Sequence, residues 1–197
     1  MTAAWRNCAW APGSEMKSTS ANFFAVVVSA SLIILNPFDL RPSWPSSPVF
    51  DVVFLTNEDY LSVLRETIHE AKRSIYVEMY LIRPGPSDDH PVNTILSDLS
   101  SARKRGVQVR VVMDSHFGKD NERAAEKLKA GGVWDVQFDD PDVTNHTKLV
   151  MVDDEILIVG SQNWTLSALR ASNESAVYVR DPALAAELQR KLKREGS

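Results

Sequence analysis

The chain has 197 residues, of which 44% are apolar, and this is enough for one domain with a sizeable core. Its net charge of −4 argues against a protein that clamps nucleic acid through overall positive charge, although it leaves room for a local basic groove. A lone cysteine, Cys8, excludes an internal disulfide framework and a cysteine-based zinc site.

The first part of the chain is expected to lie outside the folded body. Residues 1–36 combine a disordered start with an apolar run from Phe23 to Leu35. That run is short for a spanning helix, which needs about 20 residues, and is typical of a signal-peptide core or a short anchor. We therefore expect export or membrane anchoring through residues 22–36, whether or not the segment is cleaved. A buried element of the domain is the alternative.

A linker follows this segment. Residues 37–48 contain four prolines and several serines, a composition typical of an extended connection. The catalytic domain is therefore expected to occupy residues 49–197.

Strands alternate with helices along this domain. Apolar runs predict strands at 49–55, 74–82, 107–113, 133–138, 149–152, 156–159 and 175–179. Helical spacing predicts helices after Asn57 as the N-cap, from Val92 to about Gly106, over about 120–130, and from Pro182 onward. The alternation predicts the α/β class, a sandwich around a mixed β-sheet.

Most chemically useful residues gather around one predicted hairpin. Its strands, Leu149–Val152 and Ile156–Val159, are continuous apolar runs joined by an acidic turn. Residues two apart on a strand point to the same side, so His146 and Lys148 share a face if the strand already begins there. The loop after the second strand can bring Ser161 and Asn163 beside them.

An imidazole beside cationic and neutral hydrogen-bond donors suits attack on a phosphodiester. His146 is then the nucleophile, and the negatively charged oxygens are held by Lys148, Ser161 and Asn163. Glu174 can bond the other ring nitrogen of His146 and fix its tautomer. No carboxylate cluster accompanies these residues, so no metal site is predicted.

The arrangement His146-x-Lys148-x4-Asp153, then Gly160-Ser161-x-Asn163, then Glu174, resembles the HxKxxxxD signature and downstream elements of the phospholipase D superfamily. The resemblance covers about residues 50–195 and implies a phospholipase-D-like α/β/α sandwich. It further implies a metal-independent phosphodiesterase that forms a phosphohistidine and needs no cofactor. Because that reaction uses two histidines and this chain has one motif, it implies a homodimer with both His146 residues at the two-fold interface.

The resemblance also distributes the roles of the site residues. It gives a catalytic set of His146, Lys148, Glu174 and Asp153, with Asp153 better suited to a structural turn than to proton transfer. Ser161 and Asn163 bind phosphate, although either could instead cap the following segment. His116, just past a predicted strand, is a further candidate for substrate contact, with an ordinary loop histidine as the alternative.

Two substrate classes fit this chemistry. We expect a nuclease acting on DNA or RNA, and the alternative is a phospholipase D or cardiolipin hydrolase that cleaves headgroups at a phospholipid membrane. The apolar N-terminal segment favours the lipid slightly, whereas the lone cysteine cannot supply the zinc finger common in the mitochondrial hydrolases and so favours the bacterial endonuclease type. An inactive scaffolding relative is a third class, against which the intact residue set argues.

Overall fold

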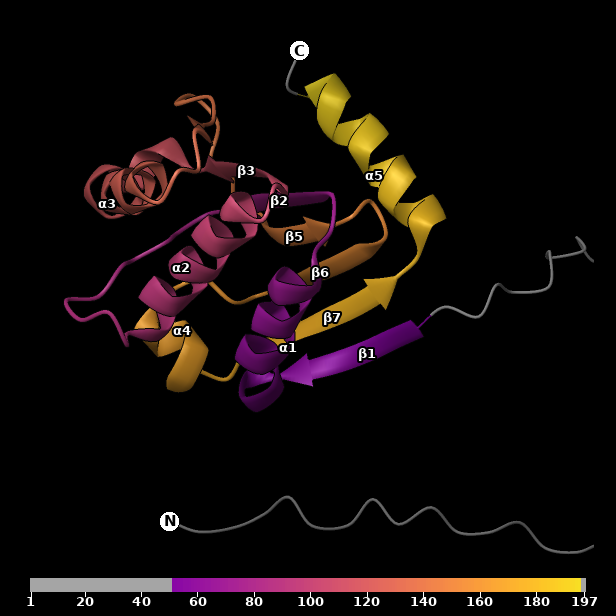
Figure 1. Ribbon diagram of the computed structural model, residues 1–197, viewed down its shortest axis with the longest axis horizontal. Helices are drawn as coiled ribbons and strands as arrows, with labels where there is room; N and C mark the ends of the chain where they lie inside the picture. The colour runs from indigo at the N-terminus through magenta and orange to yellow at the C-terminus, as the bar shows by residue number, and fades with distance from the viewer. Residues whose placement is uncertain (1–50, 196–197) are drawn as a thin grey trace, which may run out of the picture. The chain divides into compact units, whose positions relative to one another are not determined.

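The computed structural model describes residues 51–195, which form one mixed α/β domain (Figure 1). The signal or anchor segment and the linker expected before residue 49 lie outside these residues. Among the helices that are described, none is both long and apolar enough to cross a bilayer.

A seven-stranded mixed sheet forms the centre of the domain. Its strand order is β1-β7-β6-β5-β2-β3-β4, with β2, β3 and β4 parallel to one another and β5 antiparallel to β2. The remaining neighbours also pair antiparallel. The strands are β1 (Asp51–Thr56), β2 (Ser74–Met79), β3 (Gln108–Met113), β4 (Asp135–Phe138), β5 (Lys148–Val152), β6 (Ile156–Gly160) and β7 (Ser175–Arg180).

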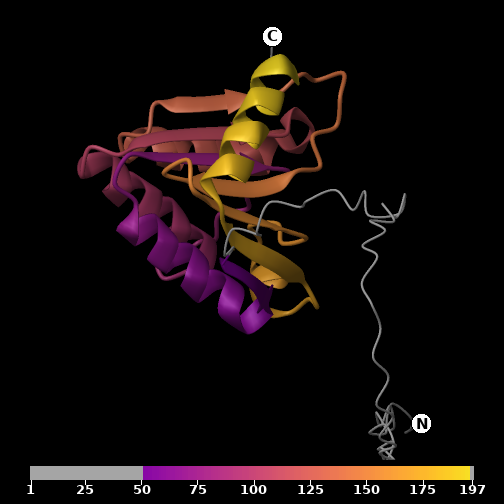
Figure 2. The same ribbon diagram turned by 90° about the vertical axis from the view of Figure 1, so that its right-hand side faces the viewer.

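Helices cover both faces of the sheet, which confirms the predicted α/β/α sandwich (Figures 1 and 2). The larger core lies under the first four helices, and a smaller one lies under the last helix, where Ala185 packs with Leu149, Met151 and Leu157. The helices are α1 (Asn57–Glu70), α2 (Pro91–Lys104), α3 (Gly118–Ala130), α4 (Leu166–Arg170) and α5 (Pro182–Glu195), with a 3₁₀ turn, η1 (Ser115–Phe117), before α3.

The start of α1 differs from the prediction, which placed the N-cap at Asn57. Thr56 is the N-cap, and its backbone N–H and hydroxyl both donate to the Asp59 carboxylate. Asn57 is thereby free for a distant partner: its side-chain oxygen accepts the backbone N–H of Glu174 at 2.7 Å. Local sequence favours either residue as a cap, so only the folded chain decides between them.

The topology places one set of strand ends together. The carboxyl ends of β2, β3 and β4 lie at the same edge as the amino end of β5, because β5 runs against β2. The carboxyl end of β6 and the amino end of β7 reach that edge by the same alternation. We call it the motif edge, since His146, Ser161 and Glu174 all lie there.

Candidate active site

His146 directly precedes β5 and is exposed at the motif edge. Its Nδ1 lies 3.1 Å from the Nζ of Lys148, and the same Nζ donates to the His146 carbonyl oxygen at 2.7 Å. The predicted juxtaposition of imidazole and ammonium is therefore present. If the ammonium donates to Nδ1, the neutral ring carries its proton on Nε2.

Tyr80, just past β2, forms an aromatic wall for this pair. Its ring centroid lies 4.3 Å from that of His146, and the Lys148 ammonium lies 4.7 Å from the Tyr80 centroid. The face of an aromatic ring attracts a cation and limits how far the two side chains can move. Tyr80 therefore helps to orient both functional groups.

Lys148 is only 8% exposed, which is unusual for a lysine. Burial lowers the pKa of its ammonium, because the charged form loses solvation, whereas the nearby Glu174 carboxylate acts in the opposite direction. The interaction with Glu174 therefore helps Lys148 to remain cationic inside the site.

Glu174 makes a contact other than the one predicted. Its carboxylate accepts a hydrogen bond from the Ser161 hydroxyl, while His146 Nδ1 faces Lys148. Ser161 in turn accepts the backbone N–H of Ser175 at 3.2 Å. The structure thus brings Ser161, Glu174 and Lys148 together, and the carboxylate acts on the hydroxyl and the ammonium.

The amide of Asn163 has an unused acceptor. Its Oδ1 is buried and has no hydrogen-bond partner among the described residues. The neighbouring Trp164 is fully buried in the core, and its Nε1–H donates to the Tyr60 hydroxyl at 3.2 Å. Trp164 fixes the backbone beside Asn163, because its own N–H donates to the Leu81 carbonyl at 3.0 Å.

Asp153 lies at the opposite end of β5 from His146. Its carboxylate accepts the backbone N–H groups of Lys72, Arg73 and Ser74 at 2.8, 2.6 and 2.9 Å. Its own backbone is left-handed, with φ of 55°, as the tight β5–β6 turn requires. These are the contacts of a turn residue, and they tie the hairpin to the start of β2.

The carboxylate of Asp153 links stability to pH. Burial alone would raise its pKa, but the three N–H donors and the Arg73 charge together lower it. A lowered folded-state pKa stabilises the fold above about pH 4, and this contribution disappears as the pH falls through the folded value.

Asp153→Asn keeps a residue that tolerates positive φ, but its NH₂ group faces the Lys72 N–H. We expect a loss of about 1–2 kcal/mol in unfolding free energy at pH 7.

Urea unfolding at pH 7 and at pH 3 tests this expectation. The difference between the wild type and Asp153→Asn should be largest at neutral pH and should shrink at pH 3. Asp154→Asn is the matched control, since Asp154 also has a positive φ but lies one residue further along the turn. An equal difference at both pH values would contradict the assignment.

His116 lies in η1, beyond the carboxyl end of β3. Its Nδ1 lies 3.2 and 3.3 Å from the two carboxylate oxygens of Asp114, a residue with no exposed surface. The second oxygen of Asp114 also accepts the backbone N–H of Asn145, immediately before His146, at 2.9 Å. The structure therefore connects His116 to the loop that carries the predicted nucleophile.

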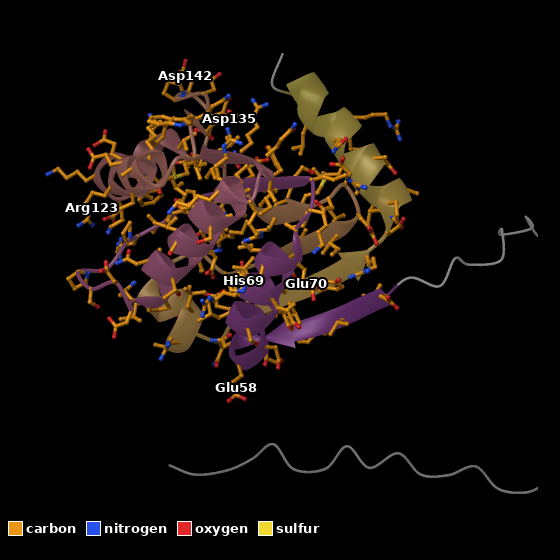
Figure 3. The ribbon with its side chains drawn as sticks, in the orientation of Figure 1. Glu58, His69, Glu70, Arg123, Asp135 and Asp142 are labelled. Carbon is orange, nitrogen blue, oxygen red and sulfur yellow. The ribbon has the colours of Figure 1, made fainter. Side chains whose placement is uncertain are left out.

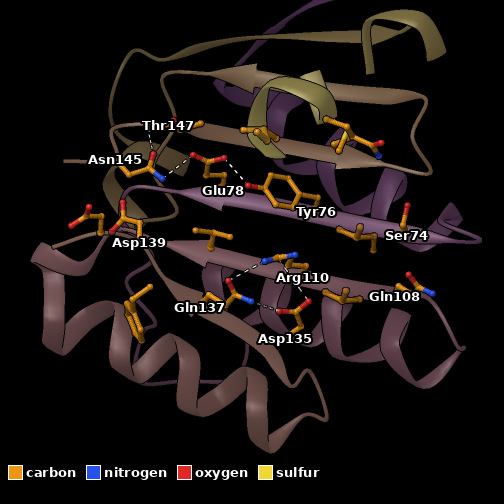
Figure 4. A pocket seen from close by; sticks show the side chains of 18 of the residues that line it. Ser74, Tyr76, Glu78, Gln108, Arg110, Asp135, Gln137, Asp139, Asn145 and Thr147 are labelled. Atoms are coloured by element: carbon orange, nitrogen blue, oxygen red, sulfur yellow. Dashed lines mark hydrogen bonds and ion pairs between the residues drawn. The ribbon is translucent and has the colours of Figure 1, made fainter. Parts of the chain in front are cut away.

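A network missed by the sequence analysis holds that loop in place (Figure 4). The Asn145 side chain donates to Glu78 at 2.8 Å and accepts the backbone N–H of Thr147 at 3.1 Å. The Tyr76 hydroxyl donates to the other Glu78 oxygen at 2.8 Å. In the sequence, only the position of Asn145 directly before the motif could have indicated this network. Glu78 lies within a predicted strand, and nothing in its surroundings indicated a role in the site.

A groove of about 1550 Å³ opens beside His146 along the face of β2, β3 and β4 that the first four helices do not cover (Figure 4). Five carboxylates and two guanidinium groups line it, so its charge is predominantly negative. The carboxylates belong to Glu78, Asp135, Asp139, Asp140 and Asp154, and the guanidinium groups belong to Arg103 and Arg110.

Fold and site together define an α/β domain with a histidine–lysine centre at one edge of a mixed sheet. A family model described as "Cardiolipin synthase, PLD-like domain" matches residues 64–195. The chain belongs to the phospholipase D superfamily, as its motif predicted.

Similar proteins carry related names. The chain is 31% identical over 120 residues to a phospholipase D of Rickettsia prowazekii, a match that covers 61% of this chain and 54% of that protein. It is 35% identical over 78 residues to the human mitochondrial cardiolipin hydrolase, covering 40% of this chain and 31% of that protein. The matched region thus spans less than two thirds of either relative.

The fold is also found in solved structures. Nuc from Salmonella typhimurium, a phospholipase D family member, superposes with a TM-score of 0.63 at 24% identity, covering 74% of this chain and 93% of that one. NucT from Helicobacter pylori gives a TM-score of 0.58 at 17% identity. At these identities the likeness concerns the fold, and it supports the assignment of the sheet and its motif edge.

Proposed function

We propose that this protein is a metal-independent phosphodiesterase that acts through a phosphohistidine on His146. The observation that carries the proposal is the exposed His146 imidazole, held 3.1 Å from the mostly buried Lys148 ammonium. An accessible nucleophile beside a fixed cation is what attack on a phosphoryl group requires. Superfamily membership supports the same chemistry.

The reaction proceeds in two balanced steps. When a substrate binds, the Lys148 ammonium turns from Nδ1 to a phosphoryl oxygen, and a ring nitrogen of His146 attacks phosphorus. The bond to the leaving oxygen breaks, and this oxygen takes a proton from a second imidazole. Water then attacks the phosphohistidine and gives its proton back to that imidazole, which releases a phosphomonoester and restores His146.

The second imidazole comes from a second copy of the chain. We propose a homodimer in which two His146 residues face one another across a two-fold axis. The exposure of His146 at the motif edge is compatible with such an approach. Light scattering across the concentrations used for assays tests the dimer, and a fully active monomer would contradict it.

The unused Asn163 Oδ1 belongs to an amide whose NH₂ group is a donor for phosphate. With Lys148, and with the Ser161 hydroxyl once it turns from Glu174 to the substrate, it provides three donors around the phosphoryl oxygens. These groups offset developing negative charge without an ion. Activity that persists in excess chelator is therefore the expected result.

We propose nucleic acid as the substrate and a phospholipid as the second candidate. The fold shared with Nuc from Salmonella, which extends over 93% of that chain, favours nucleic acid. The relatives named phospholipase D and cardiolipin hydrolase favour the lipid. A parallel assay with single-stranded DNA, RNA and cardiolipin vesicles in the presence of a chelator separates the two. Protein quenched in alkaline denaturant, in which a phosphohistidine survives, and analysed by peptide mass spectrometry should carry on His146 the phosphoryl group of the substrate with its remaining ester substituent, and label on any other residue would refute the mechanism.

Glu174 provides a separate test through the pKa of Lys148. Replacing Glu174 with glutamine removes the charge that raises this pKa, so the ammonium should lose its proton at lower pH. We expect the alkaline limb of kcat/KM on bis(p-nitrophenyl) phosphate to move to lower pH in Glu174→Gln. Glu155→Gln, at the opposite end of the hairpin, is the matched control. A limb that stays in place or moves upward would contradict the role assigned to Glu174.

A further inference from the structure

Near the motif edge, a buried carboxylate contacts the imidazole of His116. Asp114 is completely buried, and both of its oxygens lie within 3.3 Å of His116 Nδ1. Asp114 Oδ1 also accepts the backbone N–H of His116 at 2.8 Å. A buried carboxylate on Nδ1 holds the ring in one orientation and leaves Nε2 for a ligand. The His116 side chain is 44% exposed, so a ligand can reach it.

A chain of ring contacts connects Phe117, the residue after His116, to the nucleophile. The next residue, Phe117, packs edge-on against Tyr80 with ring centroids 4.6 Å apart. Tyr80 in turn lies 4.3 Å from the His146 ring. Asp114 makes a second connection through the backbone N–H of Asn145. The segment that carries His116 is therefore packed on the Tyr80 ring through Phe117 and joined to the His146 loop through Asp114.

Arg83 brings a cation to this side of the site. Its backbone N–H donates to the Trp164 carbonyl at 2.8 Å, which places it one residue from Asn163. Its Nε donates to Asp120 on α3 at 2.7 Å, and its side chain is 54% exposed. Arg83 thus connects the loop that carries Ser161 and Asn163 with helix α3, which follows His116.

The balance of charge on the two sides of His146 differs. Around the start of α3, the cations Arg83, Lys119 and Arg123 equal in number the carboxylates of Asp114, Asp120 and Glu122. The groove on the other side is lined by five carboxylates and two guanidinium groups. An anionic extension of the substrate is therefore repelled less on the α3 side than in the groove.

We propose that His116 and Arg83 form a subsite for a second phosphate of the substrate, next to the phosphate that His146 attacks. The proposal rests on the proposed phosphodiesterase function and extends it. A second phosphate is common to both substrate candidates, since a nucleic acid strand repeats it and cardiolipin carries two. In the imidazolium form, in which Nδ1–H donates to Asp114, His116 also donates through Nε2, and this N–H and the Arg83 guanidinium donate to the phosphate oxygens as charged donors.

Equilibrium binding of phosphomonoesters tests the subsite without turnover. Thymidine 3′,5′-bisphosphate is compared with thymidine 5′-monophosphate, and glycerol 1,3-bisphosphate with glycerol 3-phosphate, by titration calorimetry of the full chain. We expect the wild type to bind at least one bisphosphate about tenfold more tightly than its monophosphate, the gain of one charge-assisted hydrogen bond. The pair that shows the preference identifies the source of the second phosphate.

His116→Gln and Arg83→Gln should each remove most of this preference. His69→Gln is the matched control, because His69 on α1 is also an exposed imidazole, with its Nε2 2.8 Å from the largely buried Asp98 carboxylate (Figure 3). This control should keep the full preference. Equal affinity of the wild type for bisphosphates and monophosphates, or an unchanged preference in His116→Gln, would overturn the subsite.

Turnover gives an independent readout. The ratio of kcat/KM on a thymidylate oligomer to kcat/KM on bis(p-nitrophenyl) phosphate should fall about tenfold in His116→Gln, mainly through KM. An unchanged ratio would count against the subsite. A wild type that cleaves neither compound would refute the proposed function, and the affinity comparison would still decide the subsite.

Discussion

His146→Ala is expected to lower kcat on bis(p-nitrophenyl) phosphate by about 10⁴-fold or more, the loss typical of removing a covalent nucleophile. The ring is exposed and precedes β5, so its removal takes little from the core. Lys148 would lose one contact, to Nδ1, and keep its bond to the backbone carbonyl of residue 146. The fold should therefore survive the change.

The control for this variant is another exposed histidine. His69→Ala removes an imidazole from α1, near the opposite edge of the sheet, and should leave kcat within about twofold of the wild type. Circular dichroism and the thermal midpoint establish that both variants are folded. If His146→Ala keeps a tenth or more of the wild-type kcat, His146 is not the nucleophile.

The sequence predicted the strands well because burial leaves a direct mark on composition. All five residues of β5 are buried, and the last four form the unbroken apolar run that a strand covered on both faces requires. The hairpin then brings His146 and Ser161 to one edge by alternation of direction alone. The short helix α4 was missed, since its five residues are too few to show a helical period.

Partners distant in sequence could not be predicted. Asn57 binds the backbone of Glu174 across 117 positions, and Asp114 binds that of Asn145 across 31. No local pattern encodes such a pair, because it depends on which strands become neighbours in the sheet. The same reason explains why the sequence favoured His146 as the partner of Glu174, whereas the folded chain places Ser161 there.

Lys148 combines a feature that the sequence predicted with one that it did not. Its position in the motif was evident from the sequence, whereas its burial was not. With 8% exposure and contacts to His146 and the Tyr80 face, its ammonium is fixed before a substrate arrives. A preorganised charge stabilises a developing phosphoryl charge more than a mobile one does. Lys148→Ala should therefore lower kcat/KM by about 10²–10³-fold on every diester, and Lys148→Arg should restore little, because the wider guanidinium does not fit the buried position.

Steady-state kinetics of Lys148→Ala, Lys148→Arg and Lys104→Ala test this preorganisation. Lys104 is an exposed lysine in the last turn of α2, so its removal changes the net charge equally without touching the site. It should leave kcat/KM within about twofold of the wild type. If Lys148→Arg recovers wild-type activity, charge alone would be sufficient. The fixed geometry against Tyr80 and His146 would then not be the source of the rate enhancement.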